Sequence, residues 1–162
     1  MIMEIFSGQI QNKDEVQKLV LGVLNEHGFE YDPKKDFDLE DIEGYYLYEK
    51  GYGVFYTGMV DGNIIGTSAV RRIDDKRCEI KRIYVKKEYR GKGYGKMLFL
   101  HALEFAKKNY DIVELKTDRT LDIAISMYLK HDFYVTKEDE EAGIVYLKLN
   151  QIILNPAQPP VI

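Results

Sequence analysis

The chain has 162 residues, of which 45% are hydrophobic and 31% are charged, and its net charge is −4. This length predicts one domain with a packed core, and the acidic balance disfavours a protein whose main task is to bind nucleic acid. The single cysteine, Cys78, excludes an internal disulfide and a cysteine-based zinc cluster.

The N-terminal part predicts one helix and no targeting segment. Met1 to Glu4 lack the basic start and long apolar core of a signal peptide, and charge interrupts every apolar stretch, so we expect a cytoplasmic protein without a membrane partner. Asn12 is a candidate helix cap, apolar residues follow at helical spacing, and Gly28 ends the pattern. Residues 31–43 turn acidic and irregular, which predicts a loop with a short helix.

The middle of the chain predicts three consecutive antiparallel strands. Residues 53–60 are rich in strand-forming residues, Asp61 and Gly62 form a two-residue turn signal, and residues 63–73 resume the strand pattern. A further strand over 77–85 follows an acidic turn. Antiparallel pairing with the strand before it is the simplest arrangement.

The C-terminal half alternates helices with strands. The expected elements are a helix ending near 109, a strand over 112–117, a helix over 121–130 and strands over 133–135 and 143–149. This order predicts an α+β (mixed α/β) fold, in which helices cover the faces of a mostly antiparallel sheet. We expect residues 1–154 to form a single domain and residues 155–162 to form a loose C-terminal tail.

A glycine-rich loop joins the strand over 77–85 to the next helix. Its residues are Arg90, Gly91, Lys92, Gly93, Tyr94, Gly95 and Lys96. A helix N-terminus offers unpaired N–H groups and the positive end of a dipole, and glycines let a phosphate approach the backbone closely. Arg90 and Lys92 add charge that a pyrophosphate favours. The loop therefore predicts an anion site, and the same pattern also fits a tight turn that only starts a helix.

The glycine spacing separates this loop from two other phosphate motifs. A dinucleotide-binding fingerprint needs G-x-G-x-x-G, and a P-loop needs G-x-x-x-x-G-K-[ST]. Gly91, Gly93 and Gly95 fit neither pattern. With Arg90 before them, they resemble the [RQ]-x-x-G-x-[GA] signature of the GCN5-related N-acetyltransferase (GNAT) superfamily, which binds the pyrophosphate of acetyl-CoA.

The resemblance to this family extends on both sides of the loop. Residues 53–70 resemble its hairpin with a D-G turn, residues 78–85 its central strand, and residues 124–133 its A-I-x-x-Y-x-x-x-G-F segment. Leu121 and Asp132 stand where many relatives carry an asparagine and a glycine.

The resemblance implies a sheet that splays at the cofactor site and a direct transfer of acetyl from acetyl-CoA to a primary amine of a small molecule or protein. The implied cofactor-binding residues are Ile83, Tyr84, Val85, Arg90, Gly91, Lys92, Gly93, Tyr94, Gly95 and Lys96. Two alternatives stay open: a non-catalytic acyl-CoA sensor on this fold, and a nucleotide-phosphate binding module. His27, His101 and His131 lack metal-ligand spacing, so we expect no metal. We expect a monomer or a homodimer.

The resemblance also implies two catalytic residues. Tyr128 would lie near the cofactor sulfur, where a phenol with a pKa of about 10 can protonate a leaving thiolate; the alternative is a tyrosine packed on the sheet. Glu79, about 13 Å before Ile83 along the strand, stands where relatives often hold a glutamate that accepts the amine's proton; the alternative is a solvated carboxylate beside Lys81. Residues 36–43 stand where the family walls the acceptor site, and their charge would suit a cationic amine.

Overall fold

The computed structural model describes residues 2–8, 10, 12–48 and 51–151, and the predicted tail over 155–162 lies outside them. A seven-stranded sheet has the order β1-β2-β3-β4-β5-β7-β6. Its strands are β1 (Glu4–Ser7), β2 (Val54–Val60), β3 (Asn63–Arg72), β4 (Arg77–Val85), β5 (Ile112–Asp118), β6 (Tyr134–Asp139) and β7 (Ile144–Asn150). The helices are α1 (Lys13–Glu26), α2 (Ile42–Tyr46), α3 (Tyr94–Asn109) and α4 (Asp122–Lys130), with short 3-10 turns η1 (Phe37–Leu39) and η2 (Lys87–Tyr89). None of the described helices is both long and apolar enough to cross a membrane.

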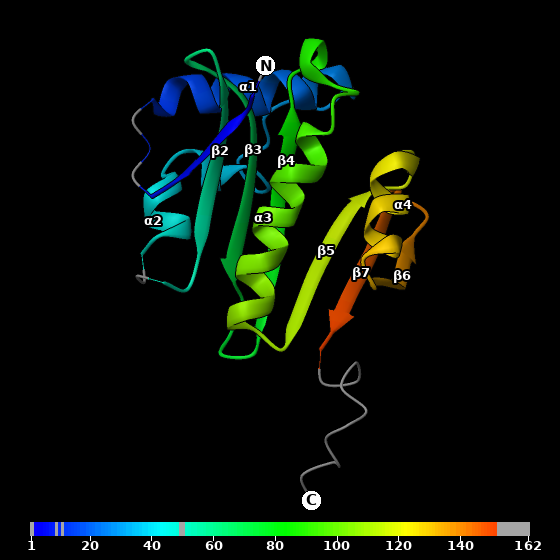
Figure 1. Cartoon of the computed structure of the whole chain (residues 1–162). Helices are drawn as coiled ribbons and strands as arrows, with labels where there is room; N and C mark the ends of the chain where they lie inside the picture. Colours follow the sequence, from blue (N-terminus) through cyan, green and yellow to red (C-terminus); the bar gives the residue numbers. More distant parts are fainter. Residues whose placement is uncertain (1, 9, 11, 49–50, 152–162) are drawn as a thin grey trace, which may run out of the picture.

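Helices cover both faces of the sheet, as the sequence predicts (Figure 1). Helices α1 and α2 pack on one side, which we call the α2 face, around Val20, Tyr46 and Phe55. Helices α3 and α4 pack on the other side, the α3 face, around Phe99 and Tyr128. Neighbouring strands are antiparallel except β4 and β5, so the prediction of a mostly antiparallel mixed α/β sheet is confirmed.

The two residues predicted to start and end the first helix do so in the structure. The Asn12 side chain accepts a hydrogen bond from the Glu15 amide at 3.1 Å and so caps α1. Gly28 takes a φ of +78° after the end of α1. Strand β1 is an addition to the predicted elements: four residues pair with the edge of β2, and so short a segment has no alternation long enough to indicate a strand.

Strands β4 and β5 separate after a short parallel pairing. Three register pairs join them, and the last is Glu79 with Glu114. Figure 1 shows the two strands forming a V that opens toward their C-terminal ends. The predicted splay of the sheet is therefore present, and the glycine loop follows the open end of β4.

A bulge in β4 accompanies this separation. The register with β3 shifts between the pairs Ala69–Lys81 and Thr67–Tyr84, and Arg82 has a φ of +57°. Strand alternation places Cys78 and Ile80 on the α3 face, so a regular strand would send Arg82 there too. The left-handed conformation instead turns Arg82 to the opposite side, because a bulge re-aims a side chain.

Candidate functional site

The glycine loop presents an open backbone at the start of α3. Gly91 and Gly93 have φ values of +78° and +84°, and a Cβ built on either one meets no described atom within 4 Å. The first turn of α3 closes with a bond from the Met97 amide to the Gly93 carbonyl at 3.1 Å. The N–H groups of Gly95 and Lys96 precede that bond and belong to those a helix leaves unsatisfied. An anion could therefore approach this backbone without meeting a side chain.

The charged side chains of this loop divide into two groups. Arg90 is committed within the protein: its Nε donates to the Val85 carbonyl at 2.8 Å, and its Nη1 lies 2.7 Å from Glu26 Oε2 on α1. Lys92 and Lys96 are exposed, and the Lys92 ammonium lies 5.5 Å from the Tyr89 ring. Arg90 thus fixes the loop to β4 and α1, and the binding of a pyrophosphate by Arg90, Lys92 and Lys96 stays a prediction.

Two predicted cofactor residues have buried side chains. Tyr94 is 7% exposed and packs in a small cluster with Met3 and Leu98, and Val85 belongs to the same cluster. Ile83 packs partly against the α3-face core and Tyr84 against the α2-face core, because the bulge lies just before them. Val85 and Tyr94 therefore leave little side-chain surface for a ligand, whereas the side chains of Ile83 and Tyr84 are half-buried.

Tyr128 reaches from α4 into the core on the α3 face. Its ring centroid lies 5.2 Å from that of Phe99 and 6.2 Å from that of Phe133, and the residue is 4% exposed. Burial, with a smaller contribution from Tyr84, raises the pKa of Tyr128 well above that of a free phenol. The phenol therefore keeps its proton at neutral pH. Tyr128 is packed on the sheet, as one interpretation of the sequence has it, and its action as an acid stays a prediction.

Glu79 is held on the α2 face by an ion pair. It lies opposite Arg71 of β3, whose Nη2 and Nε are 3.1 and 3.4 Å from the same oxygen, Oε1. Glu79 is 8% exposed, so the solvated alternative is wrong. Within the described part of the chain its second oxygen, Oε2, accepts no hydrogen bond.

Two carboxylates of the acidic segment before α2 are neutralised by an arginine of the protein itself. Arg82 donates from Nε to Asp38 Oδ2 at 3.0 Å, and from Nη2 to Asp38 Oδ1 at 2.6 Å and Asp36 Oδ1 at 3.0 Å. Tyr46 donates to Asp38 Oδ2 at 2.6 Å. Burial opposes ionisation of Asp38, but the hydrogen bonds and charge of Arg82, with the bond from Tyr46, outweigh it and lower the pKa of that carboxyl. These two carboxylates are therefore not free for the cationic amine that the sequence suggests.

The remaining acidic side chains of this segment also have partners. Asp41 Oδ1 accepts the Gly44 amide at 2.9 Å and caps α2, while Glu43 accepts the Ile10 amide at 3.1 Å. The Arg82 network is the part of this region that sequence reasoning missed. No local pattern marks it, since Arg82 and Asp38 are 44 positions apart.

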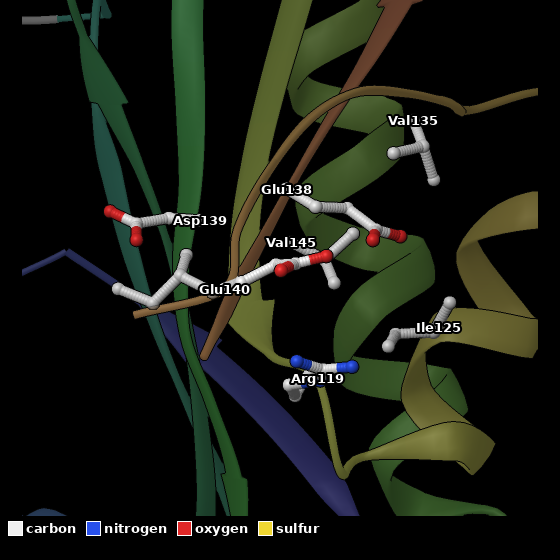
Figure 2. Close-up of a pocket in the computed structure, with 8 residues that line it drawn as sticks. Arg119, Ile125, Val135, Glu138, Asp139, Glu140 and Val145 are labelled. Atoms are coloured by element: carbon white, nitrogen blue, oxygen red, sulfur yellow. The ribbon is translucent and has the colours of Figure 1, made fainter. Parts of the chain in front are cut away.

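A small cavity lies elsewhere, between α4 and the β6–β7 hairpin. It measures about 160 Å³, and Figure 2 shows Arg119 and Ile125 facing Val145 and Glu138 across it. None of the predicted site residues lines it. The described residues also contain no cluster of three or more His, Cys, Asp or Glu side chains that could hold a metal ion.

Known proteins resemble this chain in both sequence and fold. The profile described as the acetyltransferase (GNAT) family matches residues 20–133. The N-acetylaspartate synthetase of Danio rerio is 34% identical over 64% of this chain and 37% of that protein. A GNAT-family acetyltransferase from Staphylococcus aureus superposes with a TM-score of 0.78 at 25% identity, covering 93% of this chain and 99% of that one.

A Bacillus subtilis acetyltransferase solved in complex with CoA has a TM-score of 0.66 and 27% identity, over 92% of this chain and 99% of that one. The chain spans about a third of the length of the N-acetylaspartate synthetases that it matches. The family match covers more than half of the chain and includes the glycine loop and the splayed strands. The chain therefore belongs to the GNAT family of acetyltransferases.

Proposed function

We propose that this enzyme transfers the acetyl group of acetyl-CoA directly to a primary amine. The observation that carries the proposal is the open end of β4, where pairing with β5 stops after Glu79 and the open glycine loop follows. The CoA complex of the Bacillus subtilis relative supports the choice of ligand. Bound acetyl-CoA would supply an activated thioester, and the chain would bind it and manage the protons.

The residues present fit such a ligand. The pyrophosphate would lie on the backbone of Gly91, Gly93 and Gly95, with Lys92 and Lys96 adding charge. The pantetheine arm carries amide groups, and the backbone of residues 83–85 would pair with them as an added strand does.

Two side chains would manage the protons. Glu79 would accept the proton that the amine loses when its nitrogen forms a bond to the carbonyl carbon, directly or through water. Tyr128 would give its proton to the sulfur as the carbon–sulfur bond breaks. Backbone N–H groups at the splay would polarise the carbonyl oxygen meanwhile. The buried, protonated state of Tyr128 and the unoccupied Oε2 of Glu79 support these roles.

The relatives also suggest a first acceptor to test. Four of them, from fish, frog, rat and human, are N-acetylaspartate synthetases, so aspartate is the amine with which we would begin. Because the chain covers only about a third of those proteins, aspartate is proposed here as an acceptor and does not follow from their activity.

The test separates this function from its two rivals. Acetyl-CoA should raise the melting temperature by mass action, and ATP should not. Free thiol should then appear when amines are added. Binding without turnover across an amine panel would favour a sensor, and a shift with ATP alone would favour a nucleotide-phosphate module.

A matched pair of glycine variants locates the binding site. Gly93→Val should abolish the acetyl-CoA shift, because a branched side chain would cover the backbone that the pyrophosphate approaches. Gly62→Val is the control: Gly62 also has a φ of +78° and no described atom near an added Cβ, but it lies in the β2–β3 turn. Both variants should lose a similar amount of stability to left-handed strain. Normal acetyl-CoA binding by Gly93→Val would show that the loop is not the site.

A further inference from the structure

A group of cationic side chains lies beside Glu79 on the α2 face. Lys81 follows Glu79 by two positions on β4, and Arg71 lies opposite Glu79 on β3. Both cations approach the ring of Tyr45 on α2, with Lys81 Nζ at 5.4 Å and Arg71 Cζ at 5.9 Å from its centroid. Two cations thus flank the candidate base, Glu79, and both lie near one aromatic ring.

Lys81 is a half-buried cation that no carboxylate contacts directly. Its ammonium lies near the Tyr45 ring, the charges of Glu79 and Asp38 act on it from beyond ion-pair distance, and it forms no ion pair or hydrogen bond with any residue that the structure describes. Burial lowers the pKa of the Lys81 ammonium, which means that the charged form is poorly solvated there. A bound anion would relieve that cost, since buried charge is stable when it is paired.

Arg71 has donors to spare. Its Nε and Nη2 both point to Oε1 of Glu79, so its Nη1 is not engaged by that carboxylate. The Arg71 side chain is 33% exposed, against 11% for that of Glu79. A planar guanidinium fixed on one edge can bind a second carboxylate with its remaining N–H groups.

The acidic residues nearby do not supply the missing anion. Asp36 and Asp38 are 6% and 1% exposed, and all four of their oxygens are occupied. Three accept from Arg82, with Tyr46 sharing one of them, and the fourth accepts the Asp32 amide at 2.9 Å. The groups that could contact a ligand here are therefore Arg71, Lys81 and one oxygen of Glu79.

We propose that the acceptor is an amine that carries a carboxylate, and that Arg71 and Lys81 bind the carboxylate while Glu79 faces the amine. An α-amino acid has its amine and carboxylate on one carbon, which suits a base and its neighbouring cations. A second carboxylate, as in an α-amino dicarboxylate, would engage both cations at once. Polyamines would meet two like charges, which disfavours them. This inference rests on the proposed acetyl transfer and specifies its acceptor.

The experiment measures thiol release from acetyl-CoA with three probes. These are aspartate, glycinamide, which has an α-amine and an amide in place of a carboxylate, and 1,4-diaminobutane. We expect kcat/KM to be at least about tenfold higher for aspartate than for the other two, as charge-assisted hydrogen bonds predict. Higher or equal values for glycinamide or the diamine would overturn the proposal, and they would leave acetyl transfer to an amine intact.

A charge-matched pair of variants assigns the effect to Lys81. Lys81→Gln should raise the KM for aspartate by about 10- to 100-fold, with a much smaller change for glycinamide. Lys76→Gln is the control, because it removes the same charge from an exposed position in the β3–β4 turn. Equal KM values for aspartate in the two variants would overturn the proposal.

A binding measurement keeps the test decisive if turnover is absent. Aspartate should raise the melting temperature of the CoA-bound protein, and Lys81→Gln should lose that increase while Lys76→Gln keeps it. No increase in the wild-type protein, together with no turnover, would overturn the acceptor proposal. Failure of the proposed function would look different, since acetyl-CoA itself would then produce no thermal shift.

Discussion

The two faces of β4 differ in what they bury. Toward α3 the strand presents Cys78 and Ile80, which are 0% and 1% exposed and pack in the largest core cluster. Toward α2 it presents Glu79, Lys81 and, through the bulge, Arg82. One strand thus supplies apolar packing on one side and a set of charges on the other.

The two faces are stabilised by different forces, so they should fail in different ways. Apolar side chains on the α3 face gain free energy in proportion to the area they bury. Glu79 and Arg82 on the α2 face are tolerated because each is paired, and removal of one partner leaves the other buried and uncompensated. A substitution on the α3 face should therefore report on packing, and one on the α2 face on charge balance.

Tyr128 differs from the other residues of the α3 face, because it is proposed to act chemically as well as to pack. Tyr128→Phe keeps the ring and should reduce kcat by about 10²- to 10⁴-fold if thiolate departure limits the rate. The melting temperature should change little. Tyr110→Phe is the control: Tyr110 is equally buried, its hydroxyl donates to the Tyr52 carbonyl, and its loss should cost about 0.5–1.5 kcal/mol of stability with kcat unchanged. Equal kcat values for wild type and Tyr128→Phe across a pH series would assign Tyr128 to packing alone.

Arg82 should show the largest effect on stability. Arg82→Met leaves Asp36 and Asp38 buried without their partner, and we expect a loss of about 3–5 kcal/mol in urea unfolding. Arg77→Met also removes a guanidinium from β4, but that side chain is 41% exposed and pairs with an exposed aspartate, so the loss should be much smaller. Similar losses in the two variants would mean that the buried network contributes no more than a surface pair.

The sequence predicted the parts of the molecule that depend on local rules. Asn12, the Asp61–Gly62 turn and the alternation in β2 to β4 each act through neighbours in the chain, and the elements they predict are present. The glycine loop belongs to the same class, since its strand and helix flank it directly. Its role in binding remains a prediction.

The features that the sequence did not reveal depend on distant contacts. β1 forms because β2, about fifty residues later, offers an edge. The Arg82 bulge and its aspartate partners require η1 to lie against β4, and no pattern around residue 82 indicates a left-handed residue in a strand. The same contacts changed the expected role of Asp36 and Asp38, because Arg82 already pairs with both carboxylates. The periodicity of a sequence indicates helices and strands, but it does not indicate which charged residues pair across long distances in the chain.

A substitution of Glu79 tests whether the α2 face takes part in the reaction. Glu79→Gln should lower the rate at neutral pH by about a hundredfold and recover as pH rises, because an uncharged amine no longer needs a base. Glu114→Gln is a close control, since Glu114 is the register neighbour of Glu79 on β5 and pairs with Lys148 at 3.2 Å. The control should keep the wild-type pH profile. A profile for Glu79→Gln that also matches wild type would exclude Glu79 as the base.

Acid should weaken the charged face before the apolar one. The folded-state pKa of Asp38 lies below its ordinary value, so Asp38 stabilises the fold fully above the ordinary carboxyl pKa and less as pH falls through the folded one. Without Arg82 that shift should largely disappear. The difference in unfolding free energy between wild type and Arg82→Met should therefore shrink as pH falls from 6 to 3, and a constant difference would contradict this account.

The reactivity of the Cys78 thiol measures how tightly the α3 face is packed, and it needs no substitution on that face. The residue is 0% exposed, and burial raises the pKa of the thiol, so neither access nor thiolate is available to an aromatic disulfide reagent. Native protein should release no colour over an assay, whereas protein in urea should release one equivalent per chain. Arg82→Met should also stay unreactive while folded, since it disturbs only the opposite side of β4. Rapid labelling of that variant under native conditions would show that the two faces are coupled, because loss of a charge on one side would then have opened the packing on the other.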